Sequence, residues 1–104
     1  MTAVPRALDD AQIAQFIRDG FVRIDNAFPR ELAEAARVII WRDLPCSEHD
    51  PASWTRPVVR LPYYGGPPFR DAINTGVLHA AFDQIVGQGR WRPRRDIGTF
   101  PVRF

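Results

Sequence analysis

The sequence lacks several features that would define a function class on their own. It contains no lysine, one cysteine (Cys46), two histidines and no apolar run near the ~20 residues that cross a bilayer. A single cysteine can form neither an intrachain disulfide nor a thiolate zinc site. Residues 1–10 also lack the basic start and the apolar stretch of a signal peptide. We therefore expect a cytoplasmic protein without a membrane partner, stabilised by apolar packing.

The length and the charge balance limit the possibilities further. With 104 residues, of which 45% are hydrophobic and 25% charged, the chain has room for one modest core, so we expect residues 1–104 to be a single domain or a fragment of one. All 14 basic residues are arginines and face 12 carboxylates, which leaves a net charge of +2. This excess is too small to indicate a nucleic-acid partner.

The first half of the chain carries clear helix signals. Asp9 and Gln12 have the spacing of a capping box, and Gly20 is typical of a helix end. The residues between them predict a helix, and the aromatic and β-branched run Phe21–Ile24 predicts a short strand. A second helix is predicted from Pro29 to about Asp43, because the following Leu44-Pro45 cannot continue it.

The second half alternates loops with shorter elements. Residues 45–57 predict a long loop, Val58–Leu61 a strand, and residues 63–68 turns. A helix is predicted from Asn74 or Thr75 to Val86, and a final strand over residues 97–104. That strand has no turn or polar tail after it, so we expect a truncated chain. Interleaved helices and three short strands predict an α+β fold.

Few residues suggest metal or covalent chemistry. His49 lies between Glu48 and Asp50, whose side chains point in different directions, whereas His79 and Asp83 share a helical face as half of a metal site or as a plain surface pair. Cys46 has no recognisable activating base. The run Gly87-Gln88-Gly89 resembles part of a phosphate loop but follows a helix, which favours a helix stop. We expect no metal site and no catalytic residue in this chain.

One cluster of charge stands out. Arg90, Arg92, Arg94 and Arg95 surround Trp91 within six residues, a pattern that suits an anion clamp or single-stranded nucleic acid, or a solvated connector whose tryptophan folds back on the core. Arg103 in the final strand is a candidate for attracting an anionic substrate or cosubstrate.

The segment Leu8–Ile24, LDDAQIAQFIRDGFVRI, resembles the opening of the phytanoyl-CoA dioxygenase family, whose pattern is L-(S/T)-x-x-Q-x-x-x-F-x-x-(D/N)-G-(F/Y)-(V/L)-x-(I/V). Phe28-Pro29 and the alanine-rich helix after them are similar to the family too. The region from Trp54 to Phe104 matches more loosely. The resemblance covers most of this chain but only the front part of such an enzyme.

The resemblance implies an Fe(II) and 2-oxoglutarate dependent dioxygenase with a double-stranded β-helix, or jelly-roll, fold. In the family a His-x-Asp pair and a distal His hold the iron, and an Arg anchors 2-oxoglutarate. This chain has no His-x-Asp, because Pro51 and Ala81 stand two residues after His49 and His79. The family's metal pair follows the strand corresponding to Ile97–Phe104, so no catalytic residue carries over.

These observations lead us to expect the N-terminal helices and first strands of such an oxygenase, with the barrel incomplete. The complete enzyme would hydroxylate a small organic substrate using Fe(II) and 2-oxoglutarate, while this chain alone would be inactive and bind neither. Two alternatives stay open. One is an Arg-rich module that binds phosphate or nucleic acid. The other is an interaction domain that self-associates through its exposed terminal strand.

Overall fold

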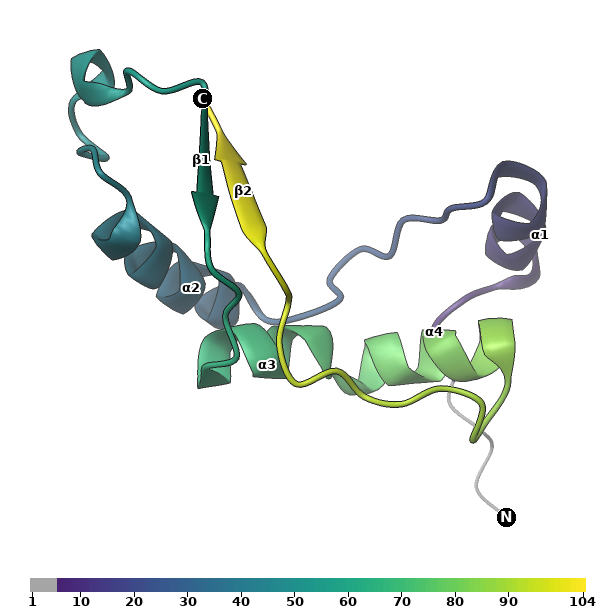
Figure 1. Cartoon of the computed structure of the whole chain (residues 1–104). Helices are drawn as coiled ribbons and strands as arrows, with labels where there is room; N and C mark the ends of the chain where they lie inside the picture. The colour runs from purple at the N-terminus through teal and green to yellow at the C-terminus, as the bar shows by residue number, and fades with distance from the viewer. Residues whose placement is uncertain (1–5) are drawn as a thin grey trace. The chain divides into compact units, whose positions relative to one another are not determined.

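A computed structural model describes residues 6–104, and within them the chain is a mixture of helix and strand (Figure 1). The described elements are α1 (Asp10–Asp19), α2 (Arg30–Asp43), the 3₁₀ turn η1 (Pro51–Ser53), β1 (Val58–Leu61), α3 (Pro67–Ile73), α4 (Gly76–Val86) and β2 (Phe100–Arg103). The predicted α+β class is confirmed. None of the helices in the described part is long and apolar enough to cross a membrane.

Helix α1 forms where its cap residues predict it. The Asp9 carboxylate accepts from the backbone N–H of Gln12 at 2.8 Å, and the Gln12 side chain accepts from the Asp9 N–H at 2.9 Å, which completes the capping box. At the other end Gly20 adopts φ +81°, and its N–H donates to the Phe16 carbonyl. Glycine suits this left-handed position because it has no Cβ.

The other two long helices also have the predicted ends. Pro29 is the N-cap of α2, one residue before the helix, and Leu44 ends α2 with an extended ψ of 145° because Pro45 follows. Helix α4 begins after Thr75, whose hydroxyl accepts from the Leu78 N–H, and ends at Gly87. Within α4 the fully buried residue is Ala81, whereas the neighbouring Phe82 is 38% exposed.

Helix α3 corrects the prediction of turns over residues 63–68. Pro67 and Pro68 occupy its first turn, where a missing N–H costs no helical hydrogen bond, and the N–H groups of Phe69 and Arg70 both donate to the Gly66 carbonyl. Helix α3 contacts α2 and buries Phe69, which is 4% exposed. The proline and glycine punctuation therefore marks a helix start here.

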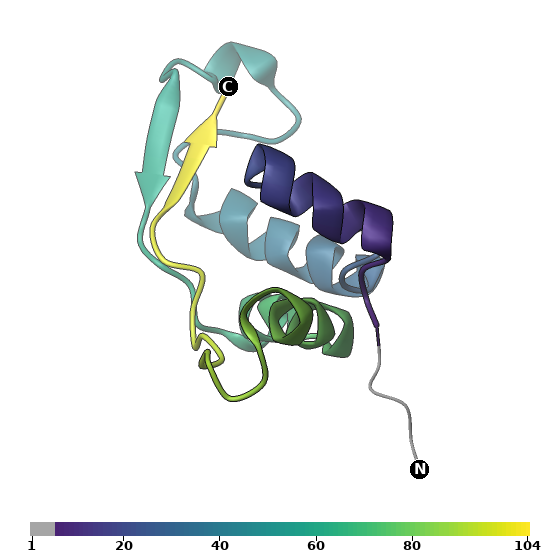
Figure 2. The same ribbon diagram turned by 90° about the vertical axis from the view of Figure 1, so that its right-hand side faces the viewer.

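Two strands pair, where the sequence predicts three. Strands β1 and β2 are antiparallel, with Val58 opposite Arg103 and Leu61 opposite Phe100, and we call them the β-ribbon (Figures 1 and 2). Strand β1 has its predicted bounds, and β2 is shorter than residues 97–104. The predicted strand Phe21–Ile24 is wrong: the segment has no strand partner in the described chain, and an extended segment becomes a strand only when its backbone groups pair.

The described residues form two compact units, each with its own small core. The first unit contains the segment up to Phe28 and Asn74–Pro93, and the second contains Pro29–Ile73 and Arg94–Phe104. Leu8 and Ala81 are the buried hydrophobic residues of the first unit, and Leu44, Leu61 and Phe69 are those of the second. The predicted loop over residues 45–57 belongs to the second unit and contains η1.

Candidate functional site

His79 and Asp83, the predicted half of a metal site, both hold Trp91. The Trp91 indole N–H donates to Asp83 Oδ1 at 2.8 Å, and the His79 ring lies edge-on to Trp91 with 4.8 Å between centroids. Phe82 contacts the same indole edge-on at 5.1 Å. In addition, His79 Nε2 is hydrogen bonded to Asn74 Oδ1 at 2.9 Å. This face of α4 therefore binds a side chain of the chain itself.

The side chains needed for iron do not come together among the residues that the structure describes. His49 is exposed in the loop before η1, and no group of three or more His, Cys, Asp or Glu residues that could hold a metal ion occurs among residues 6–104. The described residues therefore do not fit the iron site that the family resemblance implies.

The arginine run is organised around the anchored tryptophan. Gly87 ends α4 with φ +98° and Gly89 has φ +74°, so the glycine pair reverses the chain after the helix. The aliphatic part of Arg90 covers Gly87, where a Cβ would lie 3.1 Å from Arg90 Cδ. With Trp91 engaged by Asp83, His79 and Phe82, its ring is not a free platform for stacking a base. Arg92 and Arg95 are exposed.

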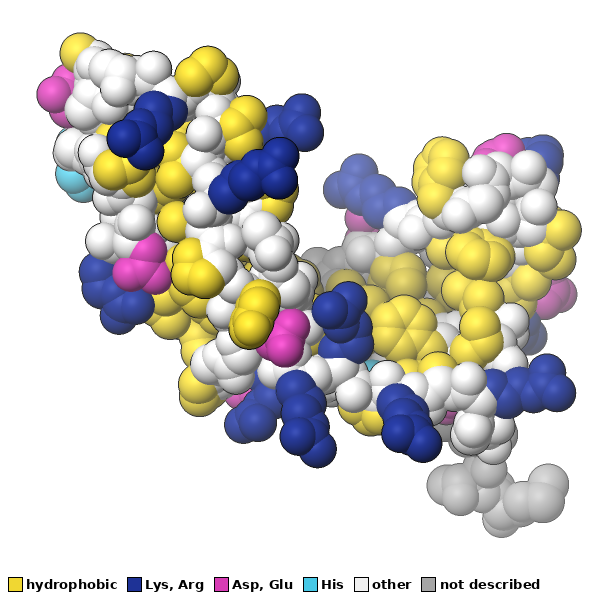
Figure 3. Space-filling model, viewed as in Figure 1, with side chains coloured by type: hydrophobic (Ala, Val, Ile, Leu, Met, Phe, Trp, Pro, Cys, Tyr) yellow, Lys and Arg dark blue, Asp and Glu magenta, His cyan; other side chains and the backbone are white. Residues whose placement is uncertain are grey.

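Arg103 lies on the exposed face of the β-ribbon, together with a residue that sequence reasoning missed. Val58, Arg60, Pro101 and Arg103 alternate with more buried neighbours, and the register places Arg60 and Arg103 diagonally on one face. None of the ion pairs within residues 6–104 involves either guanidinium. In Figure 3 dark blue arginine side chains lie over and beside this ribbon. The face is suited to attract anions.

The terminal strand β2 is paired with β1, whereas the alternative of self-association assumed that this strand is exposed. Strand β2 hydrogen bonds with β1 along Phe100–Arg103, and the Phe104 N–H donates to the Pro57 carbonyl at 3.1 Å. Its other edge has no strand partner within the described chain. Any self-association would use that remaining edge.

A polar contact near the C-terminal end of α2 was not predicted at all. The Tyr64 hydroxyl donates to Asp43 Oδ2 at 2.8 Å, and Arg42 Nε donates to Asp43 Oδ1 at 3.1 Å. The hydrogen bonds from Arg42 and then Tyr64 hold the pKa of the Asp43 carboxyl below its usual range. Burial and the bond to Asp43 raise the pKa of the Tyr64 phenol. The two residues are 21 positions apart, so no local pattern points to the pair.

Comparisons with known proteins do not assign this arrangement to a family. No family model, no curated protein and no solved structure matches the chain.

Proposed function

We propose that this chain is the N-terminal portion of an Fe(II) and 2-oxoglutarate dependent dioxygenase of the phytanoyl-CoA dioxygenase type. Its role would be scaffolding: helices that cover one sheet of a jelly-roll barrel, together with the first barrel strands. The complete enzyme would hydroxylate a small organic substrate in the cytoplasm. The resemblance of Leu8–Ile24 to the family opening is the observation that carries the proposal.

The geometry of that opening supports the proposal. The Gln of the family pattern is Gln12, which reaches back to the N-cap, and the Gly of the pattern is Gly20, which ends the helix in the left-handed conformation. Both residues therefore have a structural role at an end of the helix, which explains why a scaffold of this kind uses them. In the next segment, Phe21–Ile24, exposed and half-buried residues alternate, which is typical of a β-strand.

The apolar residues left on the surface also support a scaffold role. Ile17 is 77% exposed and Phe21 64% in the first unit, and Val38 is 70% exposed in the second. Five hydrophobic residues are buried among those described. Each unit thus leaves large apolar side chains on its surface, as we expect if the rest of the enzyme covers them.

Enzyme assays test the proposal. The protein encoded by the reading frame continued beyond Phe104 is expected to release succinate from 2-oxoglutarate when Fe(II) is present, and the 104-residue chain is expected to release none. Replacing Arg103→Met in the longer protein should raise the KM for the anionic substrate or cosubstrate by up to about tenfold, because a cationic face concentrates anions. Robust succinate release by the 104-residue chain alone would contradict the scaffold role.

A further inference from the structure

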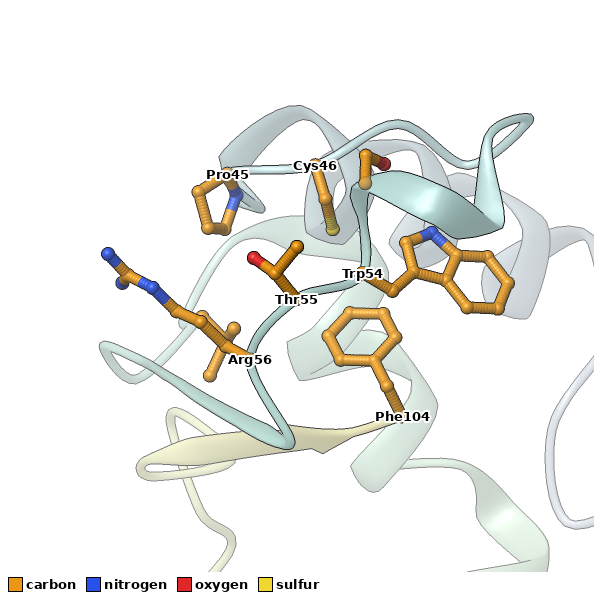
Figure 4. A pocket seen from close by; sticks show the side chains of 8 residues that line it. Pro45, Cys46, Trp54, Thr55, Arg56 and Phe104 are labelled. Carbon is orange, nitrogen blue, oxygen red and sulfur yellow. The ribbon is translucent and has the colours of Figure 1, made fainter.

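The second unit contains a small pocket. It has a volume of about 140 Å³ and is lined by the loop before β1, by β1 and by the residue after β2, namely Pro45, Cys46, Ser53, Trp54, Thr55, Arg56, Val59 and Phe104 (Figure 4). A cavity of about 150 Å³ is large enough to hold benzene. The pocket therefore accepts a ligand with a body of roughly one six-membered ring.

One wall of the pocket is aromatic. The rings of Trp54 and Phe104 lie 5.4 Å apart between centroids, and Trp41 supports both from 6.0 and 6.2 Å. Trp54 is still 37% exposed and Phe104 41%. Because Trp54 and Phe104 are packed against Trp41 and are still partly exposed, they bind an apolar ligand body at little entropic cost.

The opposite side of the pocket carries a positive charge with no internal partner. None of the hydrogen bonds or ion pairs within residues 6–104 engages the Arg56 guanidinium, and the other seven lining residues have uncharged side chains. Figure 4 shows Arg56 on the side away from Trp54 and Phe104, with Cys46 and Thr55 directed toward each other between them. A guanidinium presents a planar fork of donors that matches a carboxylate.

Hydrogen bonds fix the loop that forms the pocket. The Trp54 indole N–H donates to the Ser47 carbonyl at 2.7 Å, and the Ser47 N–H donates to Ser53 Oγ at 2.9 Å. Ser53 Oγ in turn donates to the Asp50 carbonyl at 2.6 Å, and Asp50 caps η1. The pocket is thus formed before a ligand arrives, which lowers the entropic cost of binding.

We propose that this pocket binds a small organic carboxylate, whose ring-sized apolar body lies against Trp54 and Phe104 and whose carboxylate pairs with Arg56. The inference does not depend on the proposed oxygenase function, because every lining residue belongs to the chain described here. Cys46 contributes to the wall and provides a reporter, since it is the sole cysteine of the sequence.

The test is a titration of the ¹⁵N-labelled 104-residue chain with benzoate, and with benzamide as a neutral ligand of matched shape. The three tryptophans give three indole N–H signals. Benzoate is expected to shift the Trp54 signal saturably and to slow alkylation of Cys46 by iodoacetamide. The Trp91 signal, which reports the first unit, is expected to stay in place, and benzamide should bind at least about tenfold more weakly.

Two variants assign the charge. Arg56→Gln is expected to weaken benzoate binding by about tenfold or more, whereas Arg18→Gln, which removes an exposed arginine of the first unit, should leave binding unchanged. Equal binding of benzoate and benzamide would overturn the proposal, and so would the absence of any saturable shift. Inorganic phosphate that matches benzoate would also overturn it, because charge alone would then suffice. The benzoate and benzamide comparison uses the unmodified chain and needs no variant to fold.

Discussion

The two compact units use a loop tryptophan in opposite ways. In the first unit Trp91 is held by the Asp83 carboxylate and by the rings of His79 and Phe82, so its polar and apolar surfaces both have partners. In the second unit Trp54 also has a hydrogen bond, to the Ser47 carbonyl, but its ring remains open along a pocket beside Arg56. The same residue type closes a fold in one unit and leaves a binding surface in the other.

This difference separates a structural tryptophan from a candidate binding residue. The arginine run around Trp91 is the most conspicuous charge cluster in the sequence, yet its aromatic residue has a structural role. Arg56 is inconspicuous in the sequence, yet it lines the pocket opposite the aromatic wall and has no carboxylate partner in the described chain. The arginine run around Trp91 and the Arg56 site differ in whether their side chains have partners within the chain, and only the fold shows this.

Alanine substitutions at the two tryptophans are expected to have the largest effects. Trp91→Ala is expected to lower the free energy of unfolding by about 2–4 kcal/mol, because it removes a half-buried ring and leaves Asp83 without its donor. Trp54→Ala should cost about 1 kcal/mol and abolish benzoate binding, since its ring is more exposed. Urea denaturation followed by circular dichroism measures both. A larger loss for Trp54→Ala than for Trp91→Ala would reverse the assigned roles.

The Gln84 side chain holds the segment before α1 by hydrogen bonds in the first unit. Its Oε1 accepts from the N–H groups of Ala7 and Leu8 at 2.8 and 2.9 Å, and its Nε2 donates to the Leu8 carbonyl at 2.8 Å. Gln84→Ala is expected to cost about 2–3 kcal/mol of unfolding free energy, because three hydrogen bonds around buried Leu8 are lost. The exposed Gln88→Ala variant is the control and should change stability little. Similar urea midpoints for both variants would argue against this clamp.

The smallest effect concerns pH and the contact between Asp43 and Tyr64 in the second unit. The lowered pKa of Asp43 contributes stability at pH values above the ordinary carboxyl pKa of about 4, and this contribution is lost as pH falls through the folded pKa. The raised pKa of Tyr64 contributes stability below about pH 10, which is lost as pH rises through the folded pKa.

Urea midpoints measured from pH 2 to pH 11 test this pair. Asp43→Asn should flatten the acid limb of the stability profile, and Tyr64→Phe should flatten the alkaline limb. We expect both changes to be modest because both side chains contact solvent. An unchanged profile in both variants would show that the pair contributes nothing to stability.

Local signals account for what the sequence could predict. The caps at Asp9, Gly20, Thr75 and Gly87 lie within a few residues of the helices they bound, so the pattern alone locates those helices. Strand β1 was located by the β-branched Val58-Val59 and the stop at Pro62. Helix α3 was missed because Pro67-Pro68 after two glycines is typical of turns as well as of a helix start.

Long-range contacts account for what it could not predict. Whether Phe21–Ile24 becomes a strand depends on a partner strand, and no pattern within the segment encodes one. The Gln84 clamp around Leu8 joins residues that are 76 positions apart, and the hydrogen bond between Tyr64 and Asp43 joins residues that are 21 positions apart. Arg60 and Arg103 share a face only through the register of the β-ribbon.

Translation of the reading frame beyond the codon for Phe104 tests the proposal that this chain is the scaffold of a family enzyme. The account predicts that its translation contains a His-x-Asp pair within a few tens of codons, followed later by a further His and an Arg. A stop codon directly after Phe104, or a continuation without these residues, would contradict the oxygenase proposal.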